Sequence, residues 1–124
     1  MKRLGHPTLL LVHGAWHRKE MWRLLIDELP DVDIRALQLP SSAPVPVDQL
    51  GDLYDDATAI RTAVADIGRS CVVLAHSYGG APTTQALAGV DSVLRVVYLS
   101  AWQLDVGESL LSIIGGLRCM AVLL

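Results

Sequence analysis

Residues 71–80 read CVVLAHSYGG, and this stretch decides how the whole chain folds. Its aliphatic first half predicts a buried strand, and the two glycines at its end open a predicted helix. Ser77 therefore lies in a sharp turn that strains its backbone and requires small residues two positions away, as Ala75 and Gly79 are. The pattern predicts that the Ser77 hydroxyl projects from the carboxyl end of a strand as a nucleophile for acyl transfer. The N-terminus of the following helix and the backbone N–H of Tyr78 would then face the developing negative charge.

Strands and helices are predicted to alternate along the rest of the chain. Strands are expected over 8–12, 33–37, 71–76 and 93–99, and helices over 18–29, 48–67 and 78–88, with a short amphipathic piece over 108–114. This order predicts an α/β fold with a doubly wound parallel sheet of about four strands and flanking helices. Ligands of such sheets bind at the carboxyl ends of the strands, where His13, Gly14, Ala15, Ser77 and Tyr78 all fall.

The predicted helix ends rest on specific residues. Pro30 should end the first helix, and the prolines within 38–47 make that segment a loop. Asp48 is the predicted N-cap of the second helix and Gly68 its C-cap. The apolar stripe of that helix comprises Leu53, Ala57, Ile60, Val64 and Ile67, whereas Asp52, Asp55, Asp56 and Arg61 lie largely off it.

Composition narrows the classes of function. The chain has 124 residues and is 52% hydrophobic, so it can bury a core. It carries a net charge of −3 and has no basic patch that would indicate binding to nucleic acid. Neither a phosphate-binding lysine loop nor a G-x-G-x-x-G turn is present, and the His and Cys residues are too dispersed to bind a metal. We expect no cofactor and no membrane segment. The use of two cysteines, Cys71 and Cys119, fits a reducing cytoplasm.

Two separated motifs resemble the α/β-hydrolase superfamily: LVHGAWH at 11–17 and AHSYGG at 75–80. The HGAWH residues and the run VYLSAW at 97–102 look most like the esterase-like branch that includes small bacterial hydrolases and plant methylesterases. This resemblance spans roughly residues 8–112. It implies a cofactor-free serine hydrolase that acts on small-molecule carboxylic esters, with Ser77 as nucleophile and the N–H groups of Ala15 and Tyr78 as the oxyanion hole.

The resemblance also implies a catalytic acid and then a histidine after the nucleophile. All four histidines, His6, His13, His17 and His76, precede Ser77. We interpret them as loop-packing residues; His76, for example, should point to the opposite face from its neighbour Ser77. The candidate acid is Asp105, which is alternatively a loop aspartate near the start of the 108–114 segment. Trp16 is a candidate substrate contact, with Trp102 as a further aromatic near the same site.

Residues 1–124 are therefore interpreted as a single truncated hydrolase domain, with its core at 8–112 and an atypical tail at 113–124. Family members are about twice as long, and the strand at 93–99 would lack a neighbour, which predicts self-association through an open sheet edge. Two alternatives stay open. The chain is an inert fragment that acts at most through that edge, or it belongs to a non-hydrolytic, lyase-type member of the same family.

Overall fold

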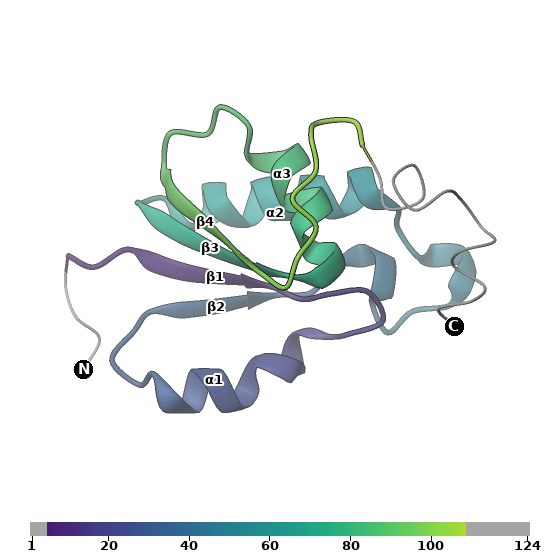
Figure 1. Cartoon of the computed structure of the whole chain (residues 1–124). Coiled ribbons are helices and arrows are strands. Elements are labelled where there is room, and N and C mark those ends of the chain that lie inside the picture. The colour runs from purple at the N-terminus through teal and green to yellow at the C-terminus, as the bar shows by residue number, and fades with distance from the viewer. Residues whose placement is uncertain (1–4, 109–124) are drawn as a thin grey trace.

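The structure is a computed structural model that describes residues 5–108. Its strands are β1 (Thr8–Val12), β2 (Ile34–Leu37), β3 (Cys71–His76) and β4 (Val93–Leu99). They pair in parallel in the order β2-β1-β3-β4 (Figure 1). All four predicted strands are confirmed, and β2 begins one residue later than predicted. The remainder of the predicted 108–114 piece and the tail at 113–124 lie outside the described residues.

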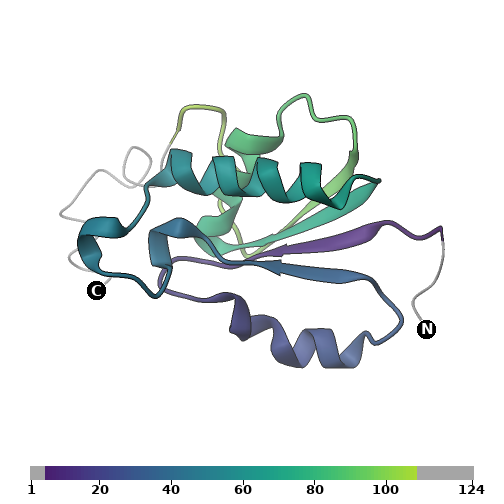
Figure 2. The ribbon, with the colours of Figure 1, turned by 180° about the vertical axis from the view of Figure 1, so that it is seen from behind.

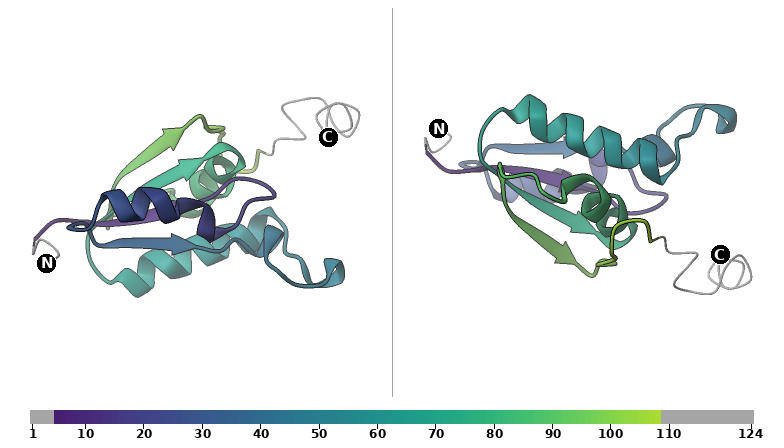
Figure 3. Two further views of the ribbon diagram at one scale, coloured as in Figure 1. Left: turned by 90° about the horizontal axis from the view of Figure 1, so that it is seen from below. Right: turned by 90° about the horizontal axis from the view of Figure 1, so that it is seen from above.

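Helices cover both faces of this sheet. The described residues form α1 (Arg23–Glu28), α2 (Leu53–Ile67) and α3 (Gly80–Leu87). Helix α1 lies on one face, and α2 and α3 lie on the other (Figure 1, Figure 2). The view from below shows α1 crossing β1 and β2, and the view from above shows α2 and α3 over the opposite face (Figure 3). The predicted doubly wound α/β architecture is therefore confirmed.

Helix α2 begins later than predicted, with Asp52 and not Asp48 as its N-cap. The Asp52 carboxylate accepts the N–H of Asp55 at 2.9 Å, and the Asp55 carboxylate accepts the N–H of Asp52 at 2.8 Å. This reciprocal capping box satisfies two amides at the start of the helix. Asp48 lies instead in the 3-10 turn η3 (Val47–Gln49). Gly68 ends the helix in the left-handed conformation, at φ 66°, as predicted.

The first predicted helix, 18–29, is shorter and more exposed than expected. It consists of the 3-10 turn η1 (Lys19–Trp22) followed by α1. Leu29 leaves the helical region with φ −123° and ψ 58°, because the residue before a proline disfavours helical backbone. Trp22 is buried, whereas no residue of α1 is, and Leu25 is 36% exposed.

The main core lies between the sheet and the α2 and α3 helices. It includes the predicted stripe residues Ala57, Ile60, Val64 and Ile67, which pack on alternate residues of the central strands. The other face of the sheet is less covered at β4, where Leu94, Val97 and Leu99 are 59%, 38% and 47% exposed. Within residues 5–108, β4 pairs with β3 alone. No helix in this range is long and apolar enough to cross a membrane.

Candidate active site

Ser77 occupies a strained turn at the carboxyl end of β3. Its φ is 52°, in the left-handed region that non-glycine residues rarely adopt. The 3-10 turn η4 (Ser77–Gly79) follows directly, and α3 begins at Gly80. A Cβ on Gly79 would lie 2.6 Å from the carbonyl oxygen of His13, so only glycine fits this close crossing. These features agree with the strained turn and the small flanking residue that the sequence predicts.

The loop after β4 closes against the same turn. The N–H of Trp102 donates a 3.2 Å hydrogen bond to the carbonyl oxygen of Ser77. A Cβ on Gly80 would overlap the carbonyl oxygen of Trp102, so the second glycine is also required by close packing. The Ser77 turn is thus held from two sides, by the residue after β1 and by the loop after β4.

His13 fixes the turn after β1 and brings it beside Ser77. Its ring is fully buried; Nδ1 lies 2.8 Å from the carbonyl oxygen of Gly14, and Nε2 accepts the N–H of Leu39 at 3.0 Å. These contacts assign the proton to Nδ1, and burial lowers the pKa of the imidazole. A Cβ on Gly14 would lie 3.1 Å from Cβ of Ser77. The turn that carries Ala15 therefore approaches the serine closely.

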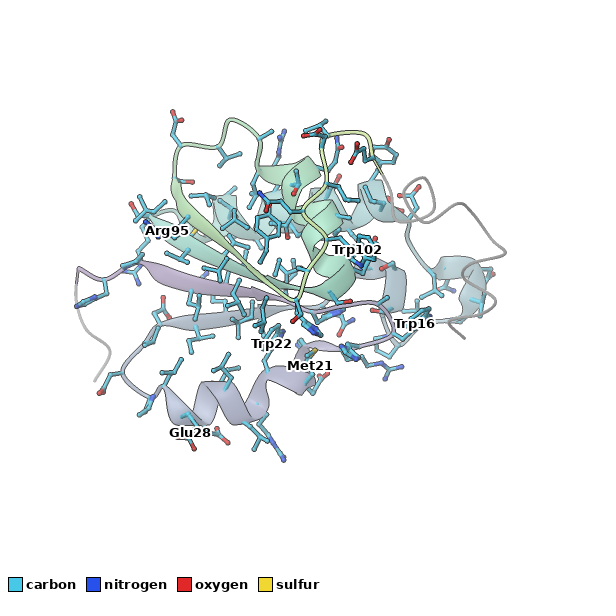
Figure 4. All side chains as sticks on the ribbon, viewed as in Figure 1. Trp16, Met21, Trp22, Glu28, Arg95 and Trp102 are labelled. Carbon is cyan, nitrogen blue, oxygen red and sulfur yellow. The ribbon has the colours of Figure 1, made fainter. Side chains whose placement is uncertain are left out.

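The two candidate oxyanion donors belong to the residues adjoining this contact. Ala15 follows Gly14 and is partly buried, while Tyr78 follows Ser77. Trp16 takes a left-handed φ of 60° and exposes 69% of its surface. Figure 4 shows Trp16 and Trp102 at the end of the sheet towards which the strands run, the same end as Ser77. Both aromatic side chains thus lie near the candidate site, and Trp16 is the more open to a ligand.

The other histidines make contacts of their own. The His76 ring stacks on His17 with centroids 5.7 Å apart and meets the edge of Trp22 at 6.4 Å. Its pKa is lowered by burial and then by His17. Within residues 5–108, no hydrogen bond joins either ring to the Ser77 hydroxyl. His6 lies at the opposite end of the sheet, where it lines a cavity with Pro7 and Glu28.

Asp105 is exposed in a turn at the C-terminal end of the described residues. Its backbone N–H donates to the Glu108 carboxylate at 3.1 Å, and its carbonyl oxygen accepts the N–H of Glu108 at 3.1 Å. Within residues 5–108, the structure brings no histidine into hydrogen-bond contact with the Asp105 carboxylate. These contacts are those of an aspartate in a turn. The role of Asp105 as the catalytic acid stays a prediction.

A buried carboxylate beneath the site was not predicted. Asp56, which the helical pattern places off the apolar stripe, has no exposed surface. It accepts the Tyr78 hydroxyl at 2.7 Å, the Ser41 hydroxyl at 2.5 Å and the Ser41 N–H at 2.9 Å. Although Asp56 was predicted to lie largely off the apolar stripe, it is buried, because the loop after β2 and Tyr78 cover this end of α2.

Comparison with known proteins decides the family. A sequence model described as the alpha/beta hydrolase family matches residues 9–122, which is most of the chain. The chain belongs to the alpha/beta hydrolase family. This assignment confirms the resemblance inferred from the LVHGAWH and AHSYGG motifs.

Two fungal proteins with hydrolase names are similar in sequence. The protein named probable hydrolase R7 from Phoma sp. is 37% identical over 121 residues, which cover 89% of this chain and 48% of the relative. The alpha/beta hydrolase nvfD from Aspergillus novofumigatus is 30% identical over 121 residues, covering 84% and 46%. The present chain thus spans about half the length of the curated relatives it matches.

Solved structures of other proteins share the fold. Tomato methylketone synthase I, complexed with 2-tridecanone, superposes with a TM-score of 0.74 at 17% identity, covering 95% of this chain and 48% of that one. An extracellular alpha/beta-hydrolase from a Paenibacillus species gives a TM-score of 0.68 at 17% identity, with 80% and 42% covered. At these identities the likeness establishes the fold alone.

The hydrolase fold also depends on a residue that the sequence does not single out. The Gln38 side chain lies where β2 ends, and its Oε1 accepts the N–H of Lys19 at 3.1 Å. Its Nε2 lies 3.2 Å from Nε2 of His13. Gln38 therefore ties the loop before α1 to the buried imidazole. A glutamine in a proline-rich loop carries no periodic signal that would have identified it.

Proposed function

We propose that this chain is the nucleophile-bearing part of a serine hydrolase that acts on carboxylic esters of small molecules. The observation that carries the proposal is the backbone of Ser77, held at φ 52° at the end of a parallel strand. Such strain is maintained where the surrounding structure over-determines it, as the close contacts of Gly79 and Gly14 do here. The family assignment supports the same chemistry.

In the proposed reaction, the Ser77 oxygen attacks the ester carbonyl carbon and forms a tetrahedral intermediate. Its negatively charged oxygen accepts hydrogen bonds from the N–H groups of Ala15 and Tyr78, which the sheet holds in place without reorganisation. Departure of the alcohol leaves an acyl group on Ser77, and water then releases the carboxylic acid.

The proposal assigns the general base to none of the four histidines of this chain. His13 uses both ring nitrogens within the fold, and His76 packs against His17 and Trp22. The general base that accepts the Ser77 proton must therefore be a group other than these histidines.

We also propose a cytoplasmic location, because Cys71 is a free, buried thiol, as is common in reducing compartments.

A second candidate is a non-hydrolytic reaction at the same serine turn. It is favoured by the fold similarity to tomato methylketone synthase I, whose name describes a synthase. One fold often carries different reactions, so the site chemistry must decide between them. Release of the alcohol from an activated aryl ester, dependent on Ser77, would favour the hydrolase.

The test is covalent labelling of the purified chain with a fluorophosphonate. Attack by the Ser77 oxygen forms a serine–phosphorus bond and expels fluoride, which the intact mass reports as one adduct. Ser77→Ala should abolish the adduct. Ser100→Ala is the matched control, because Ser100 also has a left-handed φ, 43°, and directly follows a parallel strand. Equal labelling of the parent chain and Ser77→Ala would remove the proposed function from this chain and leave an inert fragment.

A further inference from the structure

The carboxylate of Asp56 links separate segments around the candidate site. It has no exposed surface, although it lies in the first turn of α2. Its three hydrogen-bond donors come from two segments distant in sequence: the N–H and hydroxyl of Ser41, and the hydroxyl of Tyr78. All three of these donors, which lie within residues 5–108, are uncharged groups. A buried carboxylate held only by neutral donors would be destabilised strongly by the loss of one of them.

The Tyr78 side of this network acts on one candidate oxyanion donor. The 2.7 Å bond to Asp56 fixes the phenol ring beneath the Ser77 turn. Burial, and then the hydrogen bond to Asp56, raise the pKa of the Tyr78 hydroxyl, which therefore remains a donor. Fixing the side chain restricts the backbone of Tyr78, whose N–H is one of the two oxyanion donors in the proposed reaction.

The Ser41 side acts on the other candidate donor. Ser41 belongs to the 3-10 turn η2 (Pro40–Ser42). At one end of this turn, the Leu39 N–H donates to His13 at 3.0 Å; at the other, the Ser42 hydroxyl donates to the carbonyl oxygen of His17 at 2.9 Å. His13 and His17 bracket Ala15. The η2 turn therefore connects Asp56 to both ends of the segment that carries the Ala15 N–H.

We propose that Asp56 is a positioning residue that sets the two N–H donors of the oxyanion hole relative to each other. This inference rests on the proposed function. Asp56 does not touch the substrate: it acts through Tyr78 on one donor and through η2 on the other. The effect of Asp56 falls mainly on the step in which negative charge develops on the oxyanion, because the two N–H donors stabilise that charge.

The test measures fluorophosphonate labelling as a function of probe concentration, which separates the affinity of the probe, KI, from the rate constant of bond formation, kinact. Asp56→Asn and Tyr78→Phe should each lower kinact roughly tenfold, the effect of a misplaced but retained donor, and change KI by less than about twofold. The double variant should lose no more than Asp56→Asn alone, because Tyr78→Phe removes a bond that Asp56→Asn already disturbs.

Tyr98→Phe is the matched control. The Tyr98 hydroxyl makes a bond of the same length, 2.7 Å, to Thr84, between β4 and α3, and has no part in the proposed hole. It should leave both constants at their parent values. An unchanged kinact in Asp56→Asn and Tyr78→Phe, or losses that add in the double variant, would overturn the positioning role while leaving Ser77 labelling intact.

Absence of labelling in the parent chain would contradict the proposed function. A second measurement tests the inference about Asp56 even in that case. Amide NMR spectra should show the Ala15 resonance displaced in Asp56→Asn and in Ser41→Ala but not in Tyr98→Phe. Ala15 does not contact Asp56, so a displacement reports the connection through η2. An Ala15 resonance that stays in place in both variants would overturn the inference independently of activity.

Discussion

Gly79 and the backbone of His13 cross so closely that a Cβ on the glycine would lie 2.6 Å from the histidine carbonyl oxygen. The same Cβ would lie 3.0 Å from a methyl group of Val12. A backbone oxygen cannot swing aside as a side chain can. The candidate nucleophile turn and the turn after β1 are therefore in contact only because position 79 has no side chain.

Gly79→Ala should therefore destabilise the fold by about 1–3 kcal/mol or more, the usual cost of overpacking a well-packed site. Urea unfolding followed by tryptophan fluorescence would measure it. Gly89→Ala is the control: Gly89 has φ 75° and open space around it, so it should lose only about 1 kcal/mol from backbone strain. Equal losses in the two variants would argue against the close crossing.

The true start of α2 gives a second prediction. Asp52→Ala should lower the free energy of unfolding by about 1 kcal/mol, because it removes the side chain that caps the Asp55 N–H. Asp48→Ala should change it by less than about 0.5 kcal/mol, as is usual for an exposed residue outside such features. Thermal melts of both variants would provide the comparison. A larger loss in Asp48→Ala would restore the N-cap that the sequence predicts.

Short-range patterns were sufficient to predict most of this fold. Predominantly aliphatic runs identified β1, β3 and β4 with their observed bounds, although β4 includes Arg95 and none of its residues is buried. The N-cap of α2 was misplaced because Asp48 and Asp52 have equal intrinsic capping ability. What distinguishes them is the partner at the third helical position: Asp55 completes a capping box with Asp52.

The candidate site could be predicted only in part, because its supporting contacts are distant in sequence. The backbone constraint at Ser77 follows from the small residues on either side of it. Asp56 was missed because helical periodicity assigns a carboxylate off the apolar stripe to solvent. The donors that make its burial possible come from 15 residues before it and 22 residues after it. No pattern within α2 records those partners.

The exposed β4 strand leads to a prediction about association. Leu94, Val97 and Leu99 are exposed, and within the described residues the edge of β4 that faces away from β3 is unpaired; such apolar edges recruit other chains. We expect the purified chain to form oligomers and Val97→Lys to shift it towards monomer in analytical ultracentrifugation. Leu24→Lys is the control, because Leu24 is 72% exposed and lies on α1, not on β4. A parent chain that sediments as a monomer would contradict this expectation.

His13 should make the stability of the fold depend on pH near neutrality. Its buried ring is held neutral, with its pKa lowered by burial below the value of about 6.5 that it has in an unfolded chain. As the pH falls through that value, the unfolded chain binds a proton that the folded chain resists. The free energy of unfolding should therefore be fully developed above about pH 6.5 and decrease below it, by at most about 1.4 kcal/mol per pH unit for one histidine.

Urea unfolding between about pH 5.5 and 7.5 would measure this slope. His13→Gln should reduce the slope without removing it, because burial and His17 also lower the pKa of His76. If His13→Gln kept the slope of the parent chain, the neutral imidazole that makes two hydrogen bonds beneath the Gly14 turn would not be the source of the pH dependence.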